Sequence, residues 1–177
     1  MLETKNIFLR LIKESDIDLL LSLRLNQNLN KYLNQVNDNK DQQLNWLKNY
    51  KQREVIGSDF YFVIVDKELG DIGLVRVYDI NYVSKSFTWG SWIIREDNRP
   101  KYAAIESALL SFEFAFNELN LVVGNIDVRI ANVIADSFYR RFGMQYKYSD
   151  ELNNYFELTK INYVQLKYSQ YYKFLLN

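Results

Sequence analysis

The chain of 177 residues contains no cysteine and no histidine. Without cysteine there are no disulfides and no thiol nucleophile, and without histidine there is no imidazole base and no Ser-His-Asp triad. Zinc sites built from these two residue types are excluded as well. We therefore expect no metal site, and any catalysis must rely on oxygen and nitrogen groups of other side chains.

The chain also lacks an excess of charge of either sign and any long apolar run. It has 22 Lys and Arg residues against 22 Asp and Glu residues, with no basic cluster to neutralise phosphates or an anionic membrane. No apolar run approaches the roughly 18 residues that a membrane span needs. We therefore expect a cytoplasmic protein with neither nucleic acid nor membrane as a partner.

Proline and glycine are scarce, with one proline and six glycines, and no linker-like, repetitive or low-complexity segment interrupts the chain. Hydrophobic residues make up 48% of the sequence and aromatic residues 16%, enough for a substantial core. Length and continuity together predict a single domain over residues 1–177.

The periodicity of apolar residues predicts an α+β fold in which helices come first, then consecutive strands, then strands alternating with helices. The predicted strands are Ile7–Ile12, Phe60–Val65, Ile72–Ile80, Ser86–Ile94, Val122–Ile130, Gln145–Tyr148 and Tyr155–Leu158. The predicted helices are Ile17–Leu23, Asp41–Arg53, Ile105–Leu119 and Asn132–Phe142, the last closed by Gly143 at a left-handed cap. The stretch Asn26–Asn39 is predicted to be irregular or a broken helix, and the tail Asn162–Leu176 is left open.

Four motifs follow one another between residues 89 and 144. They are Trp89-Gly90-Ser91-Trp92-Ile93-Ile94, Arg99-Pro100-Lys101-Tyr102-Ala103-Ala104-Ile105-Glu106, Val128-Arg129-Ile130-Ala131-Asn132 and Phe138-Tyr139-Arg140-Arg141-Phe142-Gly143-Met144. This series resembles the core of the GNAT acyltransferase superfamily, in particular its RimJ/RimL-like branch. The resemblance implies a central mixed, mostly antiparallel twisted sheet flanked by helices, and acetyl-CoA as acyl donor.

The resemblance also implies which residues hold the donor. The backbone of Trp92, Ile93 and Ile94 would pair with the pantetheine arm, and a turn at the start of the following helix would bind the phosphates. The residues of that turn are Arg99, Lys101, Tyr102, Ala103 and Ala104. Tyr102 stands where the family has glycine and Pro100 has no N–H, so Arg99 and Lys101 would supply charge in place of some amides. This reading requires an open groove between the strand ending at Ile94 and the helix after Ala131, not plugged by Tyr102.

Asn132 and Tyr139 are seven residues apart, which places them on nearly the same face of a helix, about two turns apart. By resemblance, Asn132 would bond the pantetheine arm and Tyr139 would protonate the departing thiolate. A phenol with an ordinary pKa near 10 is protonated at neutral pH and can donate to a sulfur anion. The alternatives are a helix cap for Asn132 and a packing role for Tyr139.

The general base is not evident from the sequence. Relatives often place a glutamate where this chain has Thr88, and Glu106, Glu113 and Asp79 are left open as substitutes. A missing base favours an amine that is already partly neutral, such as one on a sugar ring.

On the acceptor side, Leu23-Arg24-Leu25-Asn26-Gln27-Asn28 resembles a motif of N-acetyltransferases that modify a nucleotide-linked amino sugar in the pseudaminic acid pathway. Arg24 would bind a diphosphate, and Trp46, Tyr78 or Trp89 would stack on a sugar or base. We therefore expect an acetyl-CoA-dependent N-acetyltransferase that acts on a small-molecule amine, in particular a nucleotide sugar for surface polysaccharide synthesis.

Two other readings stay open. One is acetylation of a protein N-terminus or a cationic antibiotic, which an acidic acceptor groove would favour. The other is a noncatalytic module that keeps only the fold. The tyrosine-rich tail, with Tyr163, Tyr168, Tyr171 and Tyr172, fits either a homodimer interface or packing onto its own domain.

Overall fold

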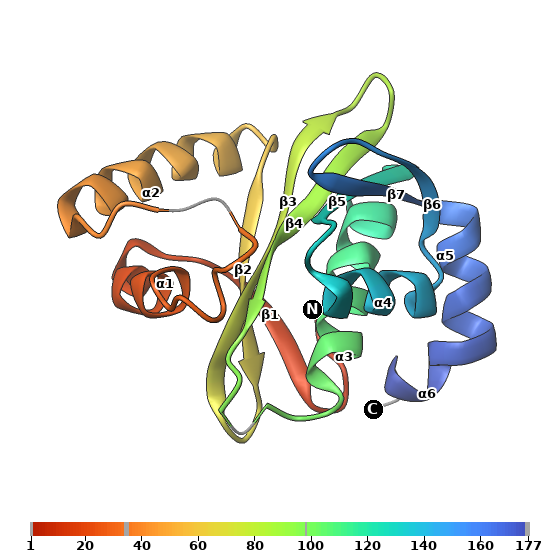
Figure 1. The fold of residues 1–177 in the computed structure, drawn as a ribbon, viewed down its shortest axis with the longest axis horizontal. Helices are drawn as coiled ribbons and strands as arrows, with labels where there is room; N and C mark the ends of the chain where they lie inside the picture. The colour runs from red at the N-terminus through yellow and green to blue at the C-terminus, as the bar shows by residue number, and fades with distance from the viewer. Residues whose placement is uncertain (1, 34–35, 98, 176–177) are drawn as a thin grey trace.

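The computed structural model describes residues 2–33, 36–97 and 99–175, and its described strands form one mixed sheet (Figure 1). The strands are β1 (Ile7–Leu11), β2 (Phe60–Asp66), β3 (Gly70–Asn81), β4 (Ser86–Ile94), β5 (Val123–Arg129), β6 (Gln145–Ser149) and β7 (Asn153–Thr159). The helices are α1 (Ile17–Arg24), α2 (Lys40–Val55), α3 (Ala103–Glu113), α4 (Val133–Phe142), α5 (Lys160–Leu166) and α6 (Tyr172–Leu175). A 3₁₀ turn, Glu14–Asp16, precedes α1, and π-helical segments Phe114–Glu118 and Lys167–Tyr171 follow α3 and α5.

The strand order is β1-β2-β3-β4-β5-β7-β6. All neighbouring pairs are antiparallel except β4 and β5, which are parallel and joined through α3. This arrangement confirms the predicted mixed, mostly antiparallel sheet with helices around it. The predicted irregular stretch is also confirmed where it is described, since residues 26–33 and 36–39 form turns and bends.

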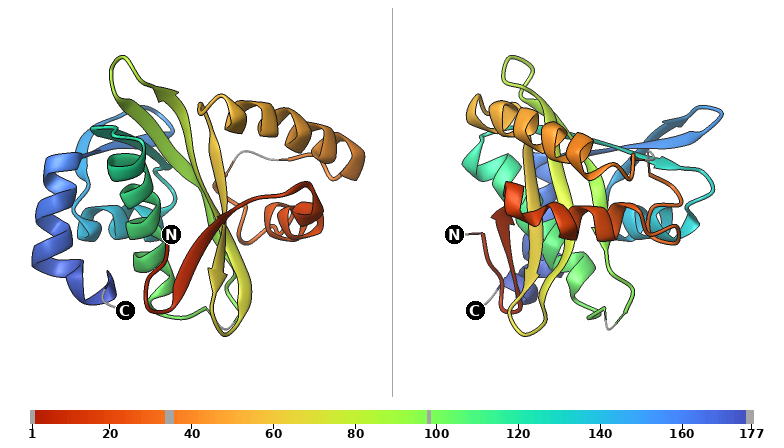
Figure 2. Two further views of the ribbon diagram at one scale, coloured as in Figure 1. Left: turned by 180° about the vertical axis from the view of Figure 1, so that it is seen from behind. Right: turned by 90° about the vertical axis from the view of Figure 1, so that its left-hand side faces the viewer.

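Helices cover both faces of the sheet. Figure 2 shows α1 and α2 on the opposite side from α3. Strand β2 illustrates why its sequence is continuously apolar: Phe62 and Ile64 belong to the core beneath α3, whereas Tyr61 and Val63 belong to the core beneath α1 and α2. A strand buried on both faces has no position for a polar residue, so its sequence does not alternate.

The C-terminal tail packs against its own domain. Tyr163 is fully buried and lies 5.3 Å from the ring of Phe116, and Tyr171 stacks on Phe142 at 5.0 Å. Tyr168 is exposed, and the side chain of Tyr172 lies outside the described residues. The tail therefore owes its aromatic content in part to intramolecular packing, and a homodimer stays a prediction. Among the described residues, no helix has both the length and the apolar character to cross a membrane.

Candidate active site

The centre of the sheet opens where β4 and β5 separate. The two strands pair only over Ser86–Thr88 and Val123–Asn125. Past that point β4 bulges, because Ser91 adopts a positive φ of 48° and the β3–β4 register shifts beside it. A bulge bends the strand that contains it. The β5-facing edge of β4 after Thr88 is therefore unpaired among the described residues.

A groove of about 490 Å³ lies alongside this unpaired edge. One wall is formed by Trp92, Ile93 and Ile94 of β4, and the other by Asn132, at the start of α4, and Phe138. The predicted opening between the strand that ends at Ile94 and the helix after Ala131 is thus present. We call this space the donor groove.

Basic residues line the end of the donor groove where α3 begins. Arg99, Lys101 and Ala104 line it, as the sequence predicts, together with Pro100. Tyr102 and Ala103 do not line the described cavities. Their part in the phosphate-binding turn stays a prediction. The Tyr102 hydroxyl instead donates a hydrogen bond to the Asp66 carboxylate at 2.7 Å, and Ala103 is fully buried in the core. Tyr102 therefore leaves the groove open.

The contact between Tyr102 and Asp66 ties the first turn of α3 to the end of β2. Burial, the largest influence, raises the pKa of Asp66, but hydrogen bonds from Tyr102 and from the backbone N–H groups of Glu68 and Leu69 together hold that pKa below its ordinary value. Asp66 is therefore a charged acceptor at neutral pH. Burial, followed by the hydrogen bond to Asp66, raises the pKa of Tyr102 to about 12, so Tyr102 remains the donor.

Replacing Tyr102 with Phe is expected to weaken acetyl-CoA binding several-fold, because the basic turn loses a tether of about 1 kcal/mol. Isothermal titration with acetyl-CoA measures this change. Tyr155→Phe is the matched control, since the Tyr155 hydroxyl also donates to a carboxylate, Asp150 at 2.7 Å, but lies outside the described cavities. Equal affinities of the two variants would show that the tether does not support the donor groove.

Asn132 and Tyr139 share the inner face of α4, as their spacing predicts. Asn132 is the N-cap of α4, where its side-chain oxygen accepts a hydrogen bond from the Ala135 N–H at 3.2 Å. Its side-chain amide nitrogen makes no hydrogen bond to the described residues, and the residue lines the donor groove. The capping role and a ligand contact are therefore compatible.

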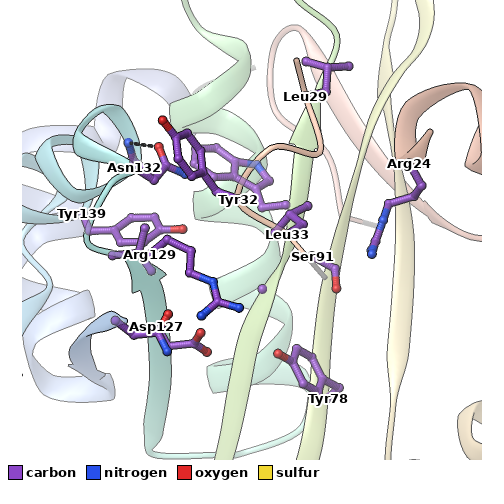
Figure 3. Close-up of a pocket in the computed structure, with 15 residues that line it drawn as sticks. Arg24, Leu29, Tyr32, Leu33, Tyr78, Ser91, Asp127, Arg129, Asn132 and Tyr139 are labelled. Carbon is purple, nitrogen blue, oxygen red and sulfur yellow. Dashed lines mark hydrogen bonds between the residues drawn. The ribbon is translucent and has the colours of Figure 1, made fainter. Parts of the chain in front are cut away.

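Tyr139 lies where the donor groove meets a second space, the central cavity of about 360 Å³ (Figure 3). Its ring is 6% exposed and packs edge-on against Trp89 and Phe156. Burial raises the pKa of Tyr139 well above its ordinary value, and the nearby Asp127 carboxylate raises it further. The hydroxyl makes no hydrogen bond to the described residues. It is thus a protonated, available donor at the cavity.

Asp127, which the sequence analysis missed, lies in the same cavity on β5 beside Tyr139 and Tyr78 (Figure 3). Its carboxylate makes no hydrogen bond or ion pair with the described residues. Burial, followed by this carboxylate, raises the pKa of Tyr78 to about 12. The signal was present in the sequence, since β5 alternates buried Ile126 and Val128 with polar neighbours, and Asp127 is one of them.

The residues left open as a base do not lie in the described cavities. Glu106 is buried and accepts hydrogen bonds from Thr4 and Asn6, and Glu113 binds Tyr163 and Lys167. Asp79 is exposed at the end of β3. Thr88 does not line the described cavities either. Among the described residues, Asp127 is therefore the carboxylate that the central cavity offers.

A third space, the acceptor cavity of about 380 Å³, continues from the central one. Arg24, Tyr78 and Ser91 line both, and Trp46 lines the acceptor cavity. Trp89 does not: it is fully buried, and its indole N–H donates to Ser111 at 2.7 Å. The prediction that Trp89 stacks on substrate is thus corrected, because a core side chain presents no face to a ligand.

The three spaces join in one trough. Trp92, Asn132 and Ala135 line both the donor groove and the central cavity. Arg24 and Tyr78 line both the central cavity and the acceptor cavity. The trough offers unpaired strand edge and basic residues at one end, a phenol and a carboxylate in the middle, and guanidinium and aromatic groups at the other. Such a layout suits transfer of an acyl group from an extended donor to a separate acceptor.

Comparison with known proteins agrees with the acyl transfer that this layout suits. The family model of the GNAT acetyltransferase domain matches residues 6–145, so the chain belongs to the GNAT family. It is an acetyl-CoA-dependent N-acetyltransferase. A search of curated protein sequences gives no match. The finer placement in the RimJ/RimL-like branch stays a prediction.

Solved structures extend the likeness to nearly the whole chain. Apo FdhC, described as a nucleotide-linked sugar GNAT, is 37% identical with a TM-score of 0.88, over 98% of this chain and 97% of that one. Spermidine N-acetyltransferase from Vibrio cholerae, in complex with CoA and spermine, is 20% identical with a TM-score of 0.78, over 89% of this chain and 98% of that one. The second likeness shows the fold alone.

Proposed function

We propose that the protein transfers an acetyl group from acetyl-CoA to the primary amine of a nucleotide-linked amino sugar. The observation that carries the proposal is the charge of the acceptor cavity. Arg24 and Arg76 line it, and among its described lining residues there is no Asp or Glu. Guanidinium groups attract phosphate oxygens and repel ammonium groups. The likeness to FdhC, at 37% identity, supports the same acceptor class.

The charge also separates this proposal from its alternatives. A site for a polyamine, a cationic antibiotic or a basic protein N-terminus needs carboxylates around the part of the acceptor that does not react. Among the described residues that line the central cavity of the trough, Asp127 is the one carboxylate, and it lies beside Tyr139. One carboxylate next to the phenol suits a single reacting ammonium group and leaves the rest of the acceptor in a cationic cavity.

The residues of this chain fit the donor. Arg99 and Lys101 would meet the phosphates at the start of α3, and the unpaired edge of β4 would accept hydrogen bonds from, and donate them to, the amides of the pantetheine arm. Acetyl-CoA supplies an activated thioester. No group of three or more metal-ligating side chains occurs among the described residues.

Two side chains would move protons. Asp127 takes a proton from the acceptor ammonium group, which leaves a neutral amine. The amine nitrogen bonds to the carbonyl carbon as the carbon–sulfur bond breaks, and Tyr139 donates its proton to the departing sulfur. The nitrogen then returns its surplus proton to the Tyr139 phenolate, and Asp127 releases to solvent the proton that it took from the ammonium group. The products are an amide and a free thiol. The two walls of the trough contribute by holding amine and thioester together.

An acceptor panel tests the proposal. With acetyl-CoA and purified protein, we expect release of CoA thiol with a uridine diphosphate-linked 4-amino sugar, and a kcat/KM at least tenfold lower with the same amino sugar lacking the nucleotide. The absence of cysteine in the chain means that a thiol reagent reads CoA release without background from the protein. Spermidine is the matched cationic control. A preference for spermidine, or no binding of acetyl-CoA at millimolar concentration, would refute the proposal.

A further inference from the structure

The acceptor cavity contains an arginine whose orientation is fixed from behind. Arg76, on β3, donates hydrogen bonds to Asp59 through Nε at 2.8 Å and through Nη2. Asp59 precedes β2, its side chain is only 3% exposed, and it does not line the cavity. It also accepts a hydrogen bond from Arg53 Nε at 3.0 Å. The carboxylate therefore holds one side of the Arg76 guanidinium group.

Aromatic rings fix the remaining freedom of this guanidinium group. Its central carbon lies 4.5 Å from the centre of the Tyr78 ring and 5.5 Å from the centre of the Trp46 ring. Its Nη1 makes no hydrogen bond to the described residues, while Arg76 itself lines the acceptor cavity. A guanidinium group held on one edge and flanked by rings has its other N–H groups left for a ligand.

A second unsatisfied donor belongs to the same cavity. The Tyr61 hydroxyl is buried and makes no hydrogen bond of good geometry to the described residues, although Tyr61 lines the cavity. Burial raises the pKa of Tyr61, whereas the charge of Arg24 and its approach to the phenolic oxygen, followed by the charge of Arg76, oppose that rise. Arg24 and Arg76 are donors, so neither accepts the hydroxyl proton of Tyr61. Two cations thus converge on one phenolic O–H. A buried donor without a partner is costly, and its presence indicates a ligand that supplies an acceptor.

We propose that the acceptor cavity is an oxyanion subsite in which Arg76, held in position by Asp59, and the Tyr61 hydroxyl bind a phosphate group of the acceptor. Trp46 forms the wall against which a planar group next to that phosphate packs. The inference rests on the proposed function and adds to it the group that is recognised and the residue that positions the recognising cation. Asp59 is a positioning residue, since it acts through Arg76.

Binding of uridine diphosphate in the absence of acetyl-CoA tests the subsite separately from catalysis. We expect Arg76→Lys to weaken binding tenfold or more, because lysine keeps the charge but loses the flat donor edge. We also expect Asp59→Asn to weaken binding by about tenfold. Asp59→Asn makes the region more positive, so attraction by net charge alone predicts tighter binding, and the two mechanisms give opposite signs.

Arg53→Gln is the matched control. Arg53 also binds Asp59, but it does not line the acceptor cavity, and we expect its replacement to leave the affinity for uridine diphosphate within about twofold of wild type. The affinity for acetyl-CoA serves as an internal reference and should not change in any of the three variants. Separate titrations with inorganic pyrophosphate and with uridine measure how much of the affinity comes from the phosphates and how much from the planar base.

The wild-type protein provides a test that does not depend on how the variants fold. The chain has three tryptophans, and their indole N–H signals are followed by NMR during titration with uridine diphosphate. We expect the signal of Trp46 to shift and that of Trp89, which is buried and bonded to Ser111, to stay in place. A stationary Trp46 signal at saturation, or tighter binding by Asp59→Asn, would overturn the inference. Either result would overturn the oxyanion subsite without refuting acetyl transfer to a nucleotide sugar. Conversely, a failed acceptor panel would refute the proposed function without changing the measured affinity for uridine diphosphate.

Discussion

Tyr139→Phe is expected to lower kcat by about 10²–10⁴-fold at neutral pH, the range that a positioned general acid contributes. The variant removes only the hydroxyl, which makes no hydrogen bond to the described residues, and it keeps the ring that packs against Trp89 and Phe156. We therefore expect no loss of thermal stability and no change in acetyl-CoA affinity. Steady-state kinetics, a melting curve and isothermal titration together separate a chemical role from a packing role.

Tyr163→Phe is the opposite case and the matched control. The Tyr163 hydroxyl donates to the Glu113 carboxylate at 2.7 Å, and neither residue lines the described cavities. Its removal is expected to lower the free energy of unfolding by about 1–2 kcal/mol and to leave kcat unchanged. If Tyr139→Phe kept full activity, or if both variants lost activity in proportion to stability, Tyr139 would have a packing role only.

The fold was largely predictable because its main signals are local. The apolar run of β2, the helical stripe of α3 and the left-handed cap at Gly143, which has a φ of 98°, all follow from residues close in sequence. The α4 face that carries Asn132 and Tyr139 follows from helical geometry in the same way. The face of a helix or strand on which a side chain lies can be predicted before the tertiary structure is known.

The contents of the site were less predictable because they depend on which neighbours are present in space. Trp46 and Trp89 are the same residue type, yet one lines the acceptor cavity and the other is fully buried beneath α3. Tyr102 turns away from the donor groove because Asp66, at the end of β2, offers it an acceptor. The hold of Asp59 on Arg76 joins positions 17 residues apart across two strands. None of these relations has a sequence period.

Asp127→Asn is expected to lower kcat/KM by about 10²-fold at neutral pH, because the acceptor then reaches the thioester mainly as an ammonium ion, which has no lone pair. The loss should shrink as pH rises, by about tenfold per pH unit until the amine loses its own proton in solution. A pH profile of kcat/KM for both proteins measures this. A merely structural role for Asp127 would give a loss that does not vary with pH.

The same substitution also bears on Tyr139 and Tyr78, whose pKa values the Asp127 carboxylate raises. Removing that charge lowers both pKa values, but burial is the larger influence on each, so Tyr139 keeps its proton and its role as acid at neutral pH. The effect of Asp127→Asn is therefore assigned to the amine. Asp79→Asn is the matched control, since Asp79 is exposed outside the described cavities and its φ of 49° suits Asn as well as Asp. Asp79→Asn removes an equal charge from the end of β3. An unchanged pH profile in this variant would assign the pH-dependent loss of kcat/KM to Asp127 itself. A profile shifted like that of Asp127→Asn would show that the loss arises from net charge alone.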